Sequence, residues 1–293
     1  MIAFDNKNGF LFANLIFYVP LHMSLYYASL NSGSNGNCFY VGNDTEAVLI
    51  DAGLSCRETE KRMKQLGLSL KKVKGIFISH EHIDHVKGVE VISQKHNIPI
   101  YINRSTRNHC RQPIPEKLSV FIENNSTIEI GKISITAFSK LHDAVDPVSY
   151  VVASEKVKVG VFTDIGSVCE NLRFHFSSCH VVFLEANYED HLLETGPYPF
   201  MLKERIRGDK GHLSNNQAIE LLTNNGSDQL SHILLAHLSK ENNNPDLALE
   251  KFKAVSTNRR IEVASRYEPT PLHFFSADIK KTAPENPMQL NLF

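Results

Sequence analysis

The short segment Ser79–His85, with the sequence SHEHIDH, concentrates side chains that could bind metal ions. His80 and His82 are two positions apart, and in an extended chain such residues point to the same side. Both imidazoles can therefore reach a single ion. Asp84 and His85 follow at the predicted turn into a helix and can face a second ion beside the first. So many potential ligands within one short segment at a strand end are hard to explain by a role in the core alone. The segment therefore indicates a metal site.

The elements around this segment predict how it is held. The apolar run GIFIS at 75–79 predicts a buried strand that ends at the segment. Helices are predicted at 56–66, 84–95, 167–176, 214–224 and 245–255, and strands at 98–102, 119–122, 126–138, 149–154, 157–163 and 180–185, besides the early runs LYYASL, NCFYVG and EAVLIDAG. This order predicts a layered α/β architecture, with two mixed sheets and helices outside them.

The composition indicates a globular protein with a sizeable core. The chain has 293 residues, of which 42% are hydrophobic, and this excludes the disordered and fibrous classes. A total of 31 basic and 32 acidic residues gives a net charge of -1, so any contact with nucleic acid must use a local basic patch. Five scattered cysteines without a C-x-x-C pair are typical of reduced thiols in a cytoplasmic protein.

The H-x-H-x-D-H pattern at 80–85 resembles the metal motif of the metallo-β-lactamase fold superfamily of dinuclear metallohydrolases. Within it, the sequence is most similar to the YycJ/WalJ-like group, through SLNSGSNGNCFYVG, LIDAGLSCRE, GHLSNNQA and HLSKENNNP. The resemblance covers roughly residues 24–260 and implies an α/β fold, the four-layer αββα metallo-β-lactamase sandwich. It also implies the ligands of two metals: His80, His82 and His142 for one, Asp84, His85 and His237 for the other, and Asp164 as a bridge.

The resemblance implies an enzyme with two divalent metal ions, and Zn, Mn or Fe all suit His and Asp ligands. Two such ions can share a bridging hydroxide that attacks phosphorus. We therefore expect a dinuclear phosphodiesterase, most specifically a DNA exonuclease of repair or replication. Two alternatives stay open: a hydrolase of a small thioester, lactone or cyclic phosphodiester, and a non-catalytic regulatory protein that binds metal. Asp84 argues against the second, because a purely structural site needs no activated water.

Residues outside the ligand set are candidates for contacts with the substrate DNA. His212 precedes a predicted helix start, where backbone N–H groups favour an anion, so it is expected, with Asp84, to take part in catalysis. It would bind a phosphate or protonate the leaving oxygen, and the alternative is that it caps its own loop. Basic stretches and a neighbouring serine are candidate phosphate-binding residues: Arg104, Arg107 and Arg111, then Lys203, Arg205, Arg207, Lys210 and Ser214. For the basic residues, the alternative is an ordinary solvated surface.

The ends of the chain are expected to lie outside the hydrolase domain, which we place at residues 23–265. Residues 1–22 contain an apolar run too short to span a membrane, and we interpret them as a leader or an upstream mis-start. Residues 266–293 are expected to be a tail. Its tip resembles the peptide by which bacterial proteins bind the DNA polymerase sliding clamp, with Gln289, Leu290, Leu292 and Phe293 as contacts. Packing of this tip on its own domain is the alternative.

Overall fold

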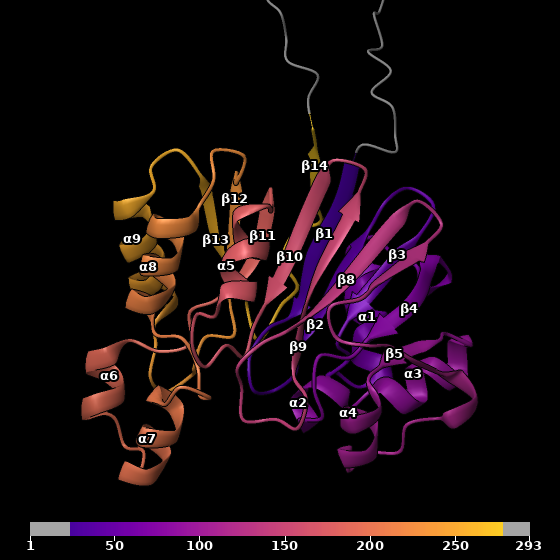
Figure 1. The fold of residues 1–293 in the computed structure, drawn as a ribbon, viewed down its shortest axis with the longest axis horizontal. Helices are drawn as coiled ribbons and strands as arrows, with labels where there is room; N and C mark the ends of the chain where they lie inside the picture. The colour runs from indigo at the N-terminus through magenta and orange to yellow at the C-terminus, as the bar shows by residue number, and fades with distance from the viewer. Residues whose placement is uncertain (1–23, 278–293) are drawn as a thin grey trace, which may run out of the picture.

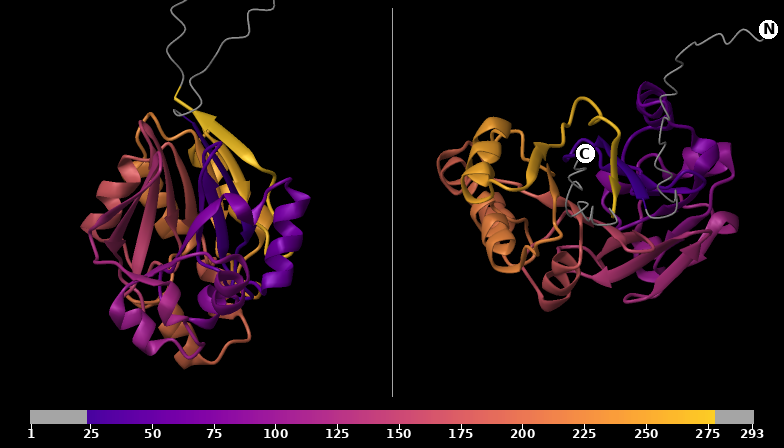
Figure 2. Two further views of the ribbon diagram at one scale, coloured as in Figure 1. Left: turned by 90° about the vertical axis from the view of Figure 1, so that its right-hand side faces the viewer. Right: turned by 90° about the horizontal axis from the view of Figure 1, so that it is seen from above.

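The structure, a computed structural model, describes residues 24–277, and these form two β-sheets packed face to face (Figure 2). The predicted leader and the predicted clamp-binding peptide lie outside the described residues. In the described part, the first sheet has the strand order β14-β1-β2-β3-β4-β5-β6. Its strands are β1 (Ser24–Asn31), β2 (Cys38–Gly42), β3 (Ala47–Ile50), β4 (Val73–Phe77), β5 (Ile100–Ile102), β6 (Ser119–Phe121) and β14 (His273–Ser276).

The second sheet has the order β13-β12-β11-β10-β9-β8-β7. Its strands are β7 (Thr127–Ile130), β8 (Ile133–Ser139), β9 (Val148–Ser154), β10 (Val157–Phe162), β11 (Val181–Glu185), β12 (His232–Ala236) and β13 (Arg260–Val263). The helices are α1 (Cys56–Gln65), α2 (Ile83–Val86), α3 (Val89–His96), α4 (Arg104–His109), α5 (Glu170–Ser177), α6 (Asp190–Thr195), α7 (Phe200–Arg207), α8 (Asn215–Asn225) and α9 (Pro245–Val255), with short 3-10 turns η2 (Leu70–Lys72) and η3 (Glu116–Leu118).

Three apolar layers hold the sheets and helices together. The central layer, with Phe39, Phe77 and Phe183, fills the space between the two sheets. A second layer packs the outer face of the first sheet against α1 and α3, and a third packs the outer face of the second sheet against α5, α8 and α9 (Figure 1). This arrangement confirms the predicted four-layer αββα sandwich. No helix within the described range is both long and apolar enough for a membrane crossing.

Parallel pairing in both sheets brings strand ends to one edge. In the first sheet β3, β4, β5 and β6 run parallel, and in the second β10, β11, β12 and β13 do so. The carboxyl ends of parallel strands lie at the same edge of a sheet, which is where loops of α/β proteins carry function. The segment SHEHIDH leaves β4 at this edge.

The structure corrects the predicted boundaries at three places. The helix expected at 84–95 is two helices, because the Gly88 N–H donates to Ala52 O at 2.8 Å instead of continuing α2. The strand expected at 126–138 is the hairpin of β7 and β8, which turns at Gly131, whose φ of +57° suits glycine. The domain also extends past residue 265, because β14 pairs with β1 throughout its length.

A close approach of backbone segments fixes the metal-motif segment on the first sheet. Gly53, just after β3, donates its N–H to Asn37 O, and Asn37 in turn donates its N–H to Asp84 O at 2.7 Å. A Cβ atom at position 53 would lie 1.7 Å from Asp84 O. Glycine at position 53 is therefore required for the loop after β3 to hold the segment that contains Asp84.

Gly53→Ala is expected to lower the free energy of unfolding by about 2 to 3 kcal/mol, because the backbone must move to accept the added methyl group. Denaturant unfolding followed by circular dichroism measures this change. The control is Gly208→Ala, whose Cβ would lie 3.1 Å from Glu204 O, a contact that small shifts can relieve. We expect the control to change the stability by about 0.5 kcal/mol or less, as is usual at surface positions. Equal effects of the two substitutions would contradict this role of Gly53.

Candidate metal centre

The residues that the sequence predicted as metal ligands come together at the shared edge of the two sheets. They reach it from separate segments, which are the loop after β4, helix α2, and the loops that follow β8, β10 and β12. The residues so gathered are His80, His82, Asp84, His85, His142, Asp164 and His237. Their side chains form overlapping groups whose possible ligand atoms lie within 4.8 Å of one another.

The first group contains His80, His82 and His142. The Nε2 atom of His80 lies 3.1 Å from Nδ1 of His82. The ring of His142 lies 4.9 Å from that of His80 and 5.2 Å from that of His82, measured between ring centroids. Three imidazoles in this arrangement offer three nitrogen atoms to one position.

The second group contains Asp84, His85 and His237 and lies beside the first. Oδ2 of Asp84 is 3.5 Å from Nε2 of His85 and 3.8 Å from Nε2 of His237. Asp164 lies between the two groups, with Oδ2 at 3.2 Å from Nε2 of His85 and Oδ1 at 3.9 Å from Nε2 of His142. Asp164 is therefore placed to contact both groups, as a bridging carboxylate would.

Surrounding groups fix the orientation of the histidine rings. Nδ1 of His85 donates to Asp51 Oδ2 at 2.7 Å, and Nδ1 of His237 lies 2.9 Å from Glu185 Oε1. Nδ1 of His142 donates to a backbone carbonyl at 3.1 Å. Because each Nδ1 atom points toward its partner, each Nε2 atom faces inward and offers a lone pair there once the ring is neutral. A carboxylate or carbonyl behind a histidine is the usual support of a metal-binding imidazole.

The inward-facing atoms lack partners among the described residues. Nε2 of His142, Nε2 of His237 and Oδ2 of Asp164 are buried without a hydrogen bond to any of them. Burying such atoms unpaired costs about 1 to 3 kcal/mol each, so their convergence needs an explanation. Nitrogen and oxygen atoms that converge on one space fit a divalent cation such as zinc. The donor set therefore suits the metal ions that the sequence predicted.

The pKa values of the buried groups also indicate that the centre suits a cation. Burial acts to raise the pKa of Asp164, but the charges of His237 and His85 hold it well below its usual range. Burial acts to lower the pKa of His237, but Asp164, Asp84 and Glu185 raise it to about 10. The centre thus keeps its carboxylates ionised and balances them with protonated histidine. A bound divalent cation can neutralise the carboxylates in place of the protonated histidines, which then release their protons.

Three residues at the centre have backbone angles in the left-handed region, with φ of 59° at Asp51 and 55° at both Asp164 and His237. Each follows directly after or close behind a strand, where it turns the chain so that the side chain faces the centre. Residues other than glycine rarely adopt this conformation, and such residues concentrate at functional sites. Backbone strain here is consistent with a site selected for its chemistry.

Two buried carboxylates at the centre were not predicted from the sequence. Asp51 accepts hydrogen bonds from His85 and from both the N–H and the hydroxyl of Ser79 at 2.8 Å. Glu185 contacts Nδ1 of both His212 and His237 at 2.9 Å and accepts the backbone N–H of Ile165. The available signal was a carboxylate at the end of an apolar strand, in LIDAG and FLEAN.

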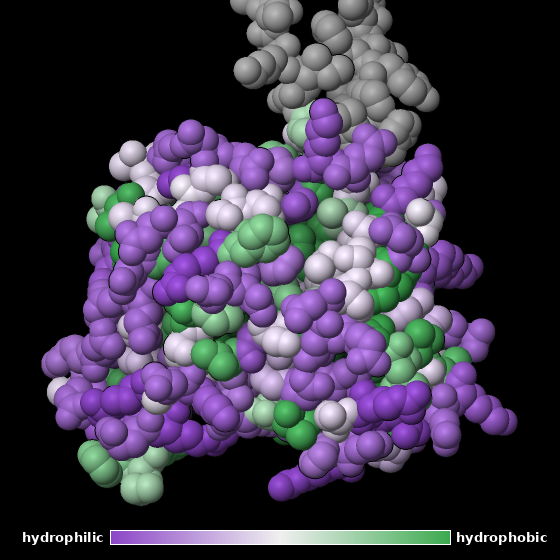
Figure 3. Space-filling model, viewed as in Figure 1, coloured by the Kyte–Doolittle hydropathy of each residue, from purple (hydrophilic) through white to green (hydrophobic). Residues whose placement is uncertain are grey.

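Two adjoining cavities open beside the centre. The smaller, of about 310 Å³, is lined by Asp84, Asp164, His212 and His237 among others. The larger, of about 990 Å³, shares Asp84 and Arg205 with it and extends to Arg111. Helix α7 forms part of the wall of the smaller cavity, and its tip is an exposed apolar patch on an otherwise mostly hydrophilic face (Figure 3). Any substrate of the centre must enter through these cavities.

The structure separates the candidate phosphate-binding residues. Arg205 lines both cavities and Arg111 lines the larger one, while neither lining includes Arg207 or Lys210. Arg207 instead pairs with the carboxylates of two glutamates, and the Lys203 ammonium donates to a backbone carbonyl at 2.6 Å. Arg205 is itself paired with Asp143 at 2.5 Å, but because it and Arg111 are the basic candidates that line these cavities, contacts with phosphate are favoured for these two.

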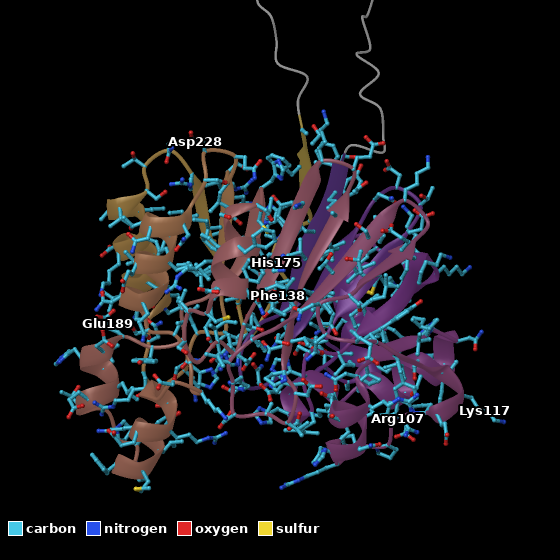
Figure 4. All side chains as sticks on the ribbon, viewed as in Figure 1. Arg107, Lys117, Phe138, His175, Glu189 and Asp228 are labelled. Carbon is cyan, nitrogen blue, oxygen red and sulfur yellow. The ribbon has the colours of Figure 1, made fainter. Side chains whose placement is uncertain are left out.

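Two further arginines pack on an aromatic ring. The guanidinium carbons of Arg104 and Arg107 lie 4.1 Å and 5.9 Å from the centre of the Phe121 ring, and Arg107 is labelled in Figure 4. Neither residue lines either of the two cavities beside the metal centre. This cation–π packing gives them a structural role on the surface of the first sheet.

The start of helix α8 is not available to an anion. The Ser214 hydroxyl accepts the N–H of Gln217, and the Gln217 side chain accepts the N–H of Ser214 at 2.9 Å. The N–H of Leu213 donates to Glu185 at 3.1 Å. The structure thus contradicts the expected substrate contact of Ser214, because its hydroxyl is buried and committed to the helix cap. His212 keeps its side chain in the smaller cavity, held by Glu185 through Nδ1.

Comparisons with known proteins find a matching family and similar chains. The model of the beta-lactamase superfamily domain matches residues 46–238. The chain is 34% identical to exodeoxyribonuclease YycJ of Bacillus anthracis, over 84% of this chain and 94% of the relative, and 32% identical to exodeoxyribonuclease WalJ of Streptococcus pneumoniae, over 76% and 84%. The crystal structure of the metallo-beta-lactamase fold protein YhfI from Bacillus subtilis has a TM-score of 0.65 at 13% identity, over 84% of this chain and 99% of that one.

Glu185→Gln is expected to weaken metal binding by about ten- to a hundredfold, because an amide cannot serve as the anionic acceptor of both His212 and His237. Metal content after dialysis against a competing chelator measures the change. The control is Glu189→Gln, labelled in Figure 4, because its carboxylate accepts from Lys251 at 2.8 Å and from Asn215 at 2.9 Å, neither of which is a proposed metal ligand. Circular dichroism should show that both variants fold. If Glu185→Gln retains the metal affinity of the wild type, the supporting role of this carboxylate is wrong.

Proposed function

We propose that this chain, which belongs to the metallo-β-lactamase superfamily and to its YycJ/WalJ group, is a metal-dependent DNA exonuclease. The observation that carries the proposal is the centre itself, where two groups of histidine and aspartate meet at Asp164 beside a large cavity that arginines line. The names of the two relatives, which match most of the chain, support the same activity. We further propose that two metal ions bind, with Zn, Mn and Fe as the candidates.

The metal ions, when bound, supply Lewis acidity for the phosphodiester oxygens and lower the pKa of a water molecule toward ~7. The side chains of the protein position the substrate. Arg205 lies at the junction of the two cavities, where its guanidinium can contact a phosphate next to the scissile bond. A guanidinium fits two phosphate oxygens at once and fixes their orientation.

His212 is proposed to handle the leaving oxygen. Its Nδ1 atom is held at 2.9 Å from Glu185 Oε1, so Nε2 is the atom left to face the substrate. In its doubly protonated form, with Nδ1–H held by Glu185, the ring can donate its Nε2 proton to the leaving oxygen or to a phosphate oxygen. Glu185 also holds His237, so one carboxylate fixes both a proposed metal ligand and the proposed proton donor.

Hydrolysis of a small substrate is the second candidate. The smaller cavity, at about 310 Å³, has the size of a small-molecule site. It opens into the larger cavity, which gives a nucleic-acid strand room to continue past Arg111. We therefore place exonuclease activity first. A role in repair or replication, a cytoplasmic location and binding of the clamp through Gln289 to Phe293 stay predictions, and that peptide lies outside the described residues.

A nuclease assay tests the proposal. Duplex DNA labelled at the 5′ or the 3′ end is incubated with the protein and a panel of divalent metals. We expect stepwise shortening from one end, complete loss of activity with a chelator, and a loss of at least a hundredfold in Asp84→Ala. The matched control is Asp246→Ala, at the exposed start of α9. If no labelled strand is shortened in a metal-dependent way, and a small thioester or phosphodiester is hydrolysed, the second candidate is favoured.

Arg205→Ala is expected to weaken DNA binding and to make the slope of log K against log salt shallower by about 1, as the loss of one phosphate contact predicts. Fluorescence anisotropy of labelled DNA measures both, in the Asp84→Ala background so that the DNA stays intact. Lys64→Ala is the control, because Lys64 is exposed on α1 and lines neither cavity. A salt slope that does not change in Arg205→Ala would mean that Arg205 contacts no phosphate.

A further inference from the structure

A second cluster of histidines lies between the edge strands of the two sheets, far from the metal centre. His232 is the first residue of β12, Glu262 lies on β13, and His273 is the first residue of β14. In the described part of the chain, β13 and β14 are edge strands of different sheets. His232 and His237 are at opposite ends of β12, and five residues of strand span about 16 Å. The cluster is therefore separate from the centre described above.

The side chains of the cluster face one another. Nε2 of His273 lies 3.1 Å from Glu262 Oε2, and Nε2 of His232 lies 3.9 Å from Glu262 Oε1. The two imidazole rings are 4.8 Å apart and nearly perpendicular, at 89°. Two ring nitrogens and one carboxylate thus point toward a shared space.

The two nitrogen atoms are deeply buried and have few partners. Nε2 of His232 has no hydrogen bond to any residue in 24–277, Nε2 of His273 has its 3.1 Å contact with Glu262, and each side chain is only 4% exposed. On the other side of its ring, His232 holds the Tyr27 hydroxyl with Nδ1 at 2.8 Å. Two buried ring nitrogens and a carboxylate that face one space point to a cation.

We propose that His232, His273 and Glu262 form a structural zinc site that joins the edge strands of the two sheets. Two imidazoles and a carboxylate are zinc ligands, and the Tyr27 hydroxyl supplies the contact behind His232 that such ligands commonly have. Glu262 is 26% exposed, so a water molecule can complete the tetrahedron from the solvent side. The site would attach β14 to the second sheet, to which the strand is not hydrogen-bonded.

The Arg260 guanidinium competes with the cation. It forms an ion pair with Glu262 Oε1, but its side chain is 59% exposed and can turn into solvent. Metal binding therefore requires only the displacement of a surface ion pair, which contributes little to stability. Removing this guanidinium should strengthen zinc binding rather than weaken it.

The test compares the zinc content of the full chain and of variants, after saturation with zinc and removal of the excess. We expect Glu262→Gln and His273→Gln to hold one zinc ion fewer per chain than the wild type. Arg260→Gln should hold the full number and bind zinc in this site severalfold more tightly. The matched control is His180→Gln, because His180 also lies next to β14, with its ring 5.4 Å from that of Phe275, but its Nδ1 already accepts a backbone N–H. The control should retain the full zinc content.

A zinc-edge anomalous map of the wild-type crystal gives an independent readout if a variant fails to fold. We expect a peak between Nε2 of His232 and Nε2 of His273, in addition to any peaks at the metal centre. Equal zinc content in the wild type, Glu262→Gln and His273→Gln would overturn the proposal. So would an anomalous map of the zinc-saturated protein with no peak at this position. Neither result bears on the exonuclease activity, which uses the other end of the sheets.

Discussion

Buried negative charge is the constraint on which the centre of this protein depends. Asp51, Asp164 and Glu185 are completely or almost completely removed from water, and Asp84 lies beside them. Isolated carboxylates in such a place would take up protons, because desolvation strongly penalises their charged form. Asp164 and Glu185 stay ionised because nearby histidines lower the pKa of both carboxyls, that of Glu185 to about 2. Once they release their protons, the same histidines are neutral and can bind metal. One arrangement can therefore neutralise the carboxylates without metal and supply ligands with it.

The fold supplies this arrangement through strand ends rather than through a single motif. β4, β10 and β12 each carry a proposed ligand just past their carboxyl ends, and parallel pairing within each sheet brings such ends to one edge. The central apolar layer then fixes the distance between the two sheets. The contact of Gly53 with the backbone of Asp84 joins the first sheet to the metal segment, and the left-handed turns at Asp164 and His237 aim those side chains inward.

The layered fold and most of the centre could be predicted from the sequence, because the metal segment lies in one short stretch of the chain. His80 to His85 are consecutive, so their chemistry is visible in one local pattern. Asp51 and Glu185 were missed because their partners lie 34 and 52 residues away, and a lone carboxylate after a strand carries no local sign of its partner. β14 was missed for the same reason, since it pairs with β1 at the other end of the domain. Ser214 shows the opposite error, because a helix start that fits an anion in sequence caps itself in the structure.

The near-zero net charge limits how DNA can be bound. The smaller cavity is lined by Asp84, Asp143 and Asp164, so a polyanion approaching it meets negative charge first. Arg205 cannot compensate for all of them, since it is already paired with Asp143. Cations held by the centre would add positive charge there and oppose the field of the carboxylates. In the exonuclease proposed above, metal ions would therefore help to bind the scissile phosphate as well as to cleave it, and Arg205 and Arg111 would hold the strand beside it.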